Sequence, residues 1–117
     1  MRHKLEGNQL GRDSEHLKSL LRNMSDSLVL HQKIITTLAK AKSLKPYIEK
    51  VLTRAKKNND FNTVKYVKNR LTTNEGVKKL ISEIAPKYKD RKGGYVRIIK
   101  LPSRAGDNAK RAKVEFV

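Results

Sequence analysis

The chain has 117 residues, and its 28 Lys and Arg against 11 Asp and Glu give a formal net charge of +17 at pH 7. It contains no cysteine, which excludes disulfide bonds, thiolate metal sites and cysteine nucleophiles. Hydrophobic residues make up 37% of the chain, too many for a wholly disordered protein, and the length suits one domain with one modest core.

Residues 1–12 are polar, contain Gly7 and Gly11 and show no periodicity, so we expect an extended N-terminal arm. No apolar run follows the first charged residues, so the start does not resemble a signal peptide. No stretch approaches the ~20 apolar residues that a membrane-spanning helix needs. We therefore expect a soluble, cytoplasmic protein.

The first half of the chain predicts two helices with a short strand between them. An apolar stripe at helical spacing predicts a helix over 14–31, capped by Asp13 or Ser14. The β-branched run 33–37 predicts a strand, and Thr37 can cap a helix that continues to Lys57. Pro46 lies inside this second helix and predicts a kink, or a new start capped by Ser43.

The second half predicts two more helices and a hairpin. A helix over 61–72 carries Phe61 on its apolar stripe, and the next helix starts at Thr73 or Asn74 and ends near Pro86. A basic loop over 87–94 leads to strands at 95–101 and 112–116, which pair across a turn at 106–108. We predict a single α+β domain over 1–117, with about four helices packed on one face of a small three-stranded mixed sheet.

The positive charge is concentrated in two segments. Residues 33–59 carry eight basic residues and one carboxylate, a net of +7, and residues 87–113 carry ten basic residues and two carboxylates, a net of +8. One such run is typical of a solvated helix face. Two weakly compensated runs in a small chain favour a surface that binds phosphate, and so a nucleic-acid partner.

Aromatic residues are few, so stacking on splayed bases is not the expected mode of binding. Phe61 and Phe116 lie on apolar stripes and are assigned to the core, whereas Tyr95, beside Gly93 and Gly94, is the aromatic residue that we expect to contact nucleic acid. The chain has neither the aromatic signature of an RNA-recognition motif nor the Gly-x-x-Gly loop of a KH domain. Folded RNA recognised by shape and backbone suits this sequence better.

Catalytic residues are not evident. The histidines His3, His16 and His31 lack metal-ligand spacing, and Asp13 and Asp107 are explained by a helix cap and a turn. We predict no enzymatic activity, no cofactor, no metal and no small-molecule substrate. A nucleoid-type DNA-binding protein and a small basic nuclease are the alternatives. The first needs a reading helix or a dimer seam, and the second needs acid–base or metal-binding carboxylates.

Several motifs, in order along the whole chain, resemble those of the family formed by the seventeenth protein of the bacterial large ribosomal subunit. They are Met1-Arg2-His3-Lys4, Leu10-Gly11-Arg12, Leu21-Arg22-Asn23-Met24, Ile35-Thr36-Thr37-Leu38, Arg91-Lys92-Gly93-Gly94-Tyr95 and Gly106-Asp107-Asn108-Ala109. Residues 58–74 match least well. The resemblance implies a two-layer domain bound to 23S-type ribosomal RNA near the exit of the nascent-chain tunnel, beside other large-subunit proteins. It implies no activity and no cofactor.

Together, the charge and the resemblance predict RNA contacts in the arm, on the first helix, on the second helix and at the end of the sheet. Gly93 and Gly94 have no side chains, so the protein backbone could approach RNA closely there. The alternative is that the loop needs glycine because its backbone adopts positive φ angles. The candidate residues are Arg2, His3, Lys4, Arg12, His16, Arg22, Asn23, Lys40, Lys42, Lys45, Arg91, Lys92, Gly93, Gly94, Tyr95, Arg97 and Arg104.

Overall fold

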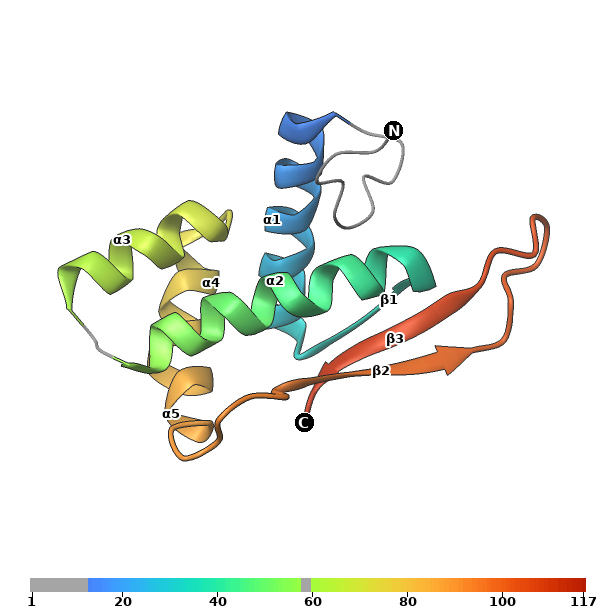
Figure 1. Cartoon of the computed structure of the whole chain (residues 1–117). Coiled ribbons are helices and arrows are strands. Elements are labelled where there is room, and N and C mark those ends of the chain that lie inside the picture. Colours follow the sequence, from blue (N-terminus) through green and yellow to red (C-terminus); the bar gives the residue numbers. More distant parts are fainter. Residues whose placement is uncertain (1–12, 58–59) are drawn as a thin grey trace, which may run out of the picture.

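The computed structural model describes residues 13–57 and 60–117, which form helices followed by a C-terminal hairpin (Figure 1). The predicted arm over 1–12 lies outside the described residues. The elements in chain order are α1 (Ser14–His31), β1 (Lys33–Thr37), α2 (Leu38–Lys57), α3 (Phe61–Arg70), α4 (Asn74–Lys79), the π-helical turn η1 (Leu80–Ile84), α5 (Ala85–Lys87), β2 (Val96–Leu101) and β3 (Arg111–Phe116). The α+β class is confirmed.

Side-chain caps set the starts of the helices. The Asp13 carboxylate accepts from the His16 N–H at 2.9 Å, and the Asp60 carboxylate accepts from the Thr63 N–H at 2.9 Å. At α4 the Thr73 hydroxyl accepts from the Gly76 N–H at 3.1 Å. Each cap satisfies a backbone donor that the first turn of a helix leaves free.

Pro46 does not restart the second helix, because α2 runs unbroken from Leu38 to Lys57. A new start capped by Ser43 is therefore wrong. Proline removes one intrahelical bond, to the carbonyl four residues earlier. Here that carbonyl belongs to Lys42, and both Lys42 and Pro46 are exposed, so solvent can satisfy it.

The last helical segment contains a feature that periodicity did not predict. Between α4 and α5 the chain forms a π-helical turn over Leu80–Ile84, and the Ala85 N–H donates to the Leu80 carbonyl. Pro86 follows directly and has no N–H to continue a regular ladder. Leu80 and Ile84 are both buried, so the turn keeps two apolar side chains in the core.

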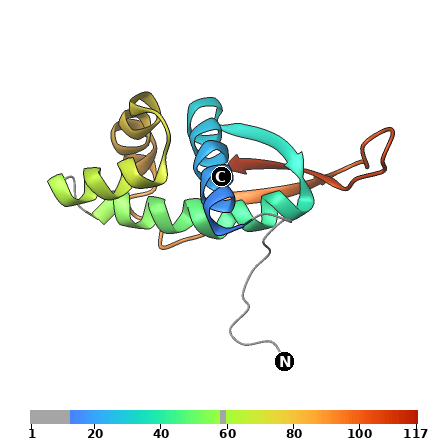
Figure 2. The same cartoon turned by 90° about the horizontal axis from the view of Figure 1, so that it is seen from above.

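The sheet has the order β1-β3-β2 and is antiparallel throughout, so the predicted mixed sheet is wrong. The strands β1 and β2 would make a parallel pair, but β3 lies between them. The β2–β3 hairpin is confirmed, and Val96 pairs with Phe116 at its base. Figure 2 shows the tip of this hairpin projecting from the end of the molecule opposite α3.

The register gives the sheet two different faces. On one, Ile34, Val114 and Ile98 form a row that packs in the core. The helix α2 contacts all three strands and covers this face, and α1 and α3 pack against α2. On the other face, the neighbouring row consists of Ile35, Lys113 and Ile99, and both isoleucines are exposed.

Two assignments of aromatic residues differ between prediction and structure. Phe61 is 77% exposed, so its predicted place in the core is wrong. Phe61 is the first residue of α3, and the buried residues of that helix are Thr63 and Val67, so spacing alone did not identify the buried side. Tyr95 is fully buried, and its ring meets that of Tyr88 edge-on at 5.4 Å between centroids. Phe116 packs against the core as predicted.

Candidate nucleic-acid interface

The predicted contacts at the end of the sheet fall into two separate groups. Gly93 and Gly94 precede β2, whereas Arg104 follows it in the hairpin loop. A strand of this length spans about 20 Å. Figures 1 and 2 both place the hairpin tip and the 87–94 loop at opposite ends of the sheet. Arg97 lies between them, on the outer face of β2.

The hairpin tip is a compact turn held by one ion pair. The Arg104 Nε donates to the Asp107 Oδ1 at 3.1 Å, and a second guanidinium nitrogen donates to Oδ2. This bonding, with a further bond from the Ala109 N–H, lowers the pKa of Asp107 to about 2. Asn108 and Gly106 adopt positive φ angles of 58° and 102°, which complete the turn. Arg104 is thus an exposed cation that already has a carboxylate partner.

Lys40 and Lys42 lie near the same end of the molecule as the hairpin loop. The Thr37 hydroxyl accepts from the Lys40 N–H at 3.4 Å, and the Leu38 N–H donates to the Lys110 carbonyl at 2.9 Å. The start of α2 is therefore attached to the base of the hairpin loop. Lys42 is exposed, and Lys40 and Lys45 are half-buried.

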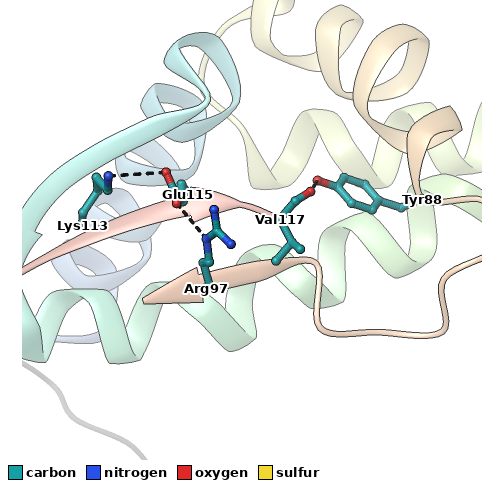
Figure 3. Close-up of polar contacts among 5 residues, drawn as sticks. All are labelled: Tyr88, Arg97, Lys113, Glu115 and Val117. Atoms are coloured by element: carbon teal, nitrogen blue, oxygen red, sulfur yellow. Dashed lines mark hydrogen bonds and ion pairs between the residues drawn. The ribbon is translucent and has the colours of Figure 1, made fainter. Parts of the chain in front are cut away.

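The outer face of the sheet carries an ion-paired row and further cations. Glu115 on β3 accepts from the Arg97 Nε at 2.7 Å and lies 3.7 Å from the Lys113 ammonium (Figure 3). The bond from Arg97, together with the nearby Lys113, lowers the pKa of Glu115. The register also places Lys33 and Arg111 on this face, so the three strands present four cations and one carboxylate there, and two of the cations contact the carboxylate.

Sequence reasoning selected only Arg97 from this face. The signal for Arg111 and Lys113 was present in the alternation of β3, where charged residues occupy every second position between Ala112, Val114 and Phe116. Lys33 can be assigned to this face only from the strand register, in which it pairs with Glu115.

On α1, all three predicted contacts have partners within the protein, and that of His16 is the Asp13 carboxylate, 3.4 Å from its Nδ1. The Arg22 guanidinium donates to the Leu71 carbonyl at 3.3 Å. The Thr72 hydroxyl donates to the Asn23 side-chain oxygen at 2.9 Å. Both bonds hold the connection between α3 and α4 against α1. His16 is exposed near the start of the helix.

The 87–94 loop presents exposed Arg91 and Lys92. Gly94 has a φ of 62°, a left-handed conformation that glycine adopts without strain, so the conformational role of this residue is observed. The Arg91 Nε donates to the Gly93 carbonyl at 3.2 Å. The Tyr95 ring is buried in the core, and its centroid lies 4.9 Å from the Lys56 ammonium. The prediction that Tyr95 contacts nucleic acid at the surface is therefore wrong.

Within residues 13–57 and 60–117, no group of three or more His, Asp or Glu side chains could hold a metal ion. In the same ranges no helix is both long and apolar enough to cross a bilayer.

These features define a class: small basic α+β proteins with cations distributed over a sheet face, helix edges and loops. The family model described as "Ribosomal protein L17" matches residues 20–117. The large ribosomal subunit protein bL17 of Nautilia profundicola is 50% identical over 121 residues, covering the whole chain and 98% of that relative. The bL17 proteins of Campylobacter jejuni and Orientia tsutsugamushi are 50% and 46% identical over 117 residues, covering 99% and 80% of those relatives. The chain belongs to the ribosomal protein L17 family.

This membership confirms the resemblance found in the motifs. The family is one of structural components without enzymatic activity, as the sequence predicted.

Proposed function

We propose that the protein is a structural constituent of the bacterial large ribosomal subunit that binds 23S-type ribosomal RNA and contacts neighbouring ribosomal proteins. The observation that supports RNA binding is the distribution of charge. The described parts of the two segments with net charges of +7 and +8 comprise β1, α2, the 87–94 loop and the β2–β3 hairpin, and most of their basic side chains are exposed. Phosphate is the ligand that such a surface attracts most strongly.

The proposed mechanism is neutralisation of RNA phosphates by guanidinium and ammonium groups from separate elements. Arginine can bind a phosphate with two parallel hydrogen bonds, so Arg91, Arg97 and Arg104 are the strongest candidates. Arg97 and Arg104 are each paired with a carboxylate in the free protein. Each would share its guanidinium between that carboxylate and a phosphate. The arm residues Arg2, His3, Lys4 and Arg12 remain part of the proposal.

A filter-binding competition tests the function. The full chain is bound to a labelled 23S-type transcript, and unlabelled ribosomal RNA or duplex DNA is added as competitor. We expect ribosomal RNA to compete far better than DNA, and the RNA to stay intact during incubation with Mg²⁺. Equal competition would favour a nucleoid-type protein, and degradation would favour a nuclease.

The proposed location near the tunnel exit, within ribosomes of the cytoplasm, rests on the family resemblance. It can be tested by placing a photo-crosslinker at Lys92 and purifying ribosomes that carry a stalled nascent chain. A crosslink to rRNA or proteins that surround the exit supports the location. Absence of the protein from large subunits washed at low salt contradicts both location and function.

A further inference from the structure

We propose that an open cleft between α2, α3 and the 93–94 loop is a binding site for single-stranded RNA. We call it the basic cleft and define it by Lys50, Arg54, Lys57, Tyr66, Gly93 and Gly94. Its volume is about 590 Å³, within the range of small-molecule sites. The inference rests on the proposed function, because it assigns one of the surfaces through which the protein would bind RNA.

The charge of the cleft comes from one face of α2. Lys50, Arg54 and Lys57 follow one another at helical i, i+4, i+7 spacing, so their side chains project in the same direction. The cleft has one acidic lining residue, Glu49, and its carboxylate accepts from the Tyr95 N–H at 2.8 Å. No carboxylate of the described residues lies within 4.0 Å of the three cations. Hydrogen bonds from Thr63, with a smaller contribution from Arg54, lower the pKa of Asp60, so Arg54 is partly compensated, but none of the three cations is ion-paired as Arg97 and Arg104 are.

One wall of the cleft is an aromatic side chain that holds two arginines. The Arg54 guanidinium carbon lies 5.3 Å from the centroid of the Tyr66 ring, and that of Arg70 lies 4.6 Å from it. Contact with a ring orients a guanidinium and leaves its N–H edges free to bind phosphate. The cleft thus presents at least one positioned cation.

Another part of the lining is glycine backbone. Gly94 is held at a φ of 62°, and beyond the adjacent residues no atom lies within 4 Å of where a side chain on Gly93 or Gly94 would start. A nucleotide can therefore approach the main chain here. Cations and open backbone in one cleft fit a strand with accessible phosphates and unstacked bases, rather than a duplex.

The experiment compares two variants that each lose three positive charges. The cleft variant is Lys50→Gln/Arg54→Gln/Lys57→Gln, and the matched control is Lys18→Gln/Lys68→Gln/Lys78→Gln, whose three lysines are also exposed. Binding of the full chain to the 23S-type transcript is measured from about 0.05 to 0.2 M salt, the range over which phosphate contacts show most clearly. Thermal unfolding confirms that both variants fold.

We expect the cleft variant to flatten the slope of log Kd against log salt by about 2, from three contacts at roughly 0.7 each. The control should change the slope much less. Arg54→Lys, which keeps the charge but not the planar group, should weaken binding while leaving the slope almost unchanged. Ultraviolet crosslinking should join Tyr66 to RNA.

Equal slope changes in the cleft and control variants would overturn the inference. A cleft variant that keeps the wild-type slope but fails to enter large subunits would also overturn it, because a protein would then occupy the cleft. Both results leave the proposed function standing if the wild-type chain binds the transcript. Failure of the wild-type chain to bind it overturns the proposed function itself.

Discussion

A buried carboxylate accounts for a glycine inside a helix. Asp26 on α1 is only 6% exposed and accepts from the Thr73 hydroxyl at 2.9 Å and the Thr73 N–H at 3.2 Å. A methyl group on Gly76 would lie 2.1 Å from the Asp26 Oδ1. Gly76 is therefore needed for space rather than for its backbone conformation, and α4 packs against α1 through this close approach.

Replacing Gly76 with alanine should destabilise the protein by about 1–3 kcal/mol, as overpacking does in a filled core. In an Asp26→Ala background the same change should cost much less, because the atom it strikes is gone. Chemical denaturation of the four proteins in this double-mutant cycle measures the difference. Equal costs in both backgrounds would show that the clash is elsewhere.

Two apolar residues that look alike in the sequence should behave in opposite ways. Leu44 is fully buried and Phe61 is 77% exposed. Leu44→Ala should cost about 2–5 kcal/mol of stability, the usual range for a buried leucine. Phe61→Ala should change stability by no more than about 0.5 kcal/mol, as surface changes do. Thermal unfolding of both variants checks the pair, and a large effect at Phe61 would contradict its exposure.

What prediction missed about two residues has one physical cause. Tyr95 was expected at the surface because of its neighbouring glycines, whereas it is buried, and the bond that Arg22 makes within the protein was not predicted. Their partners, the Leu71 carbonyl and the Tyr88 ring, come from segments that no local pattern connects to them. Periodicity identifies the apolar side of an element, but it does not identify which neighbour covers a given residue.

At the scale of the elements, prediction was more successful because the deciding chemistry is local. The caps at Asp13 and Thr73 and the alternation in β3 are properties of adjacent residues, and each was confirmed. The sheet order is not local. It depends on β3 pairing with β1 across more than 70 residues of chain, and this is why the sheet was expected to be mixed.

The hairpin loop provides a test of electrostatics within one element. The pKa of Asp107 is about 2 in the folded chain, against an ordinary value of 3.8. A lowered pKa means that the ion pair favours the folded loop above pH 3.8, and that this contribution is lost as the pH falls through about 2. NMR titration of the Asp107 carboxyl should show this midpoint.

The matched variant is Arg104→Gln, which removes the largest cause of the shift and should raise the Asp107 midpoint toward its ordinary value. A carboxyl that titrates identically in both proteins would mean that Arg104 does not hold the turn.

For the whole molecule, the net charge of +17 destabilises the folded chain, and we expect neutralisation within the ribosome to remove this effect. Like charges in a small volume repel and destabilise the compact state. The described residues bury one continuous apolar cluster that runs from Leu28 to Val114 and opposes this repulsion. We expect the chain to unfold as the single domain that we propose, in one cooperative transition.

Raising the salt concentration from 0.1 to 1 M should increase the melting temperature, because the screening length falls from about 10 to about 3 Å. Differential scanning calorimetry measures the shift. The cleft variant, which carries three fewer positive charges, should start higher and respond less. A melting temperature that falls with added salt would mean that specific ion pairs outweigh the general repulsion.

Within the described residues, the outer face of the sheet carries the exposed Ile35 and Ile99, and the sheet has edges at β1 and β2, where another strand could add. Like charges repel, so we expect lysine and arginine on that face to keep free copies of the chain apart. A short polyanion added in less than equimolar amount would neutralise this repulsion without saturating the basic surfaces. It should therefore make the unassembled protein aggregate, whereas an excess of the same polyanion should redissolve it.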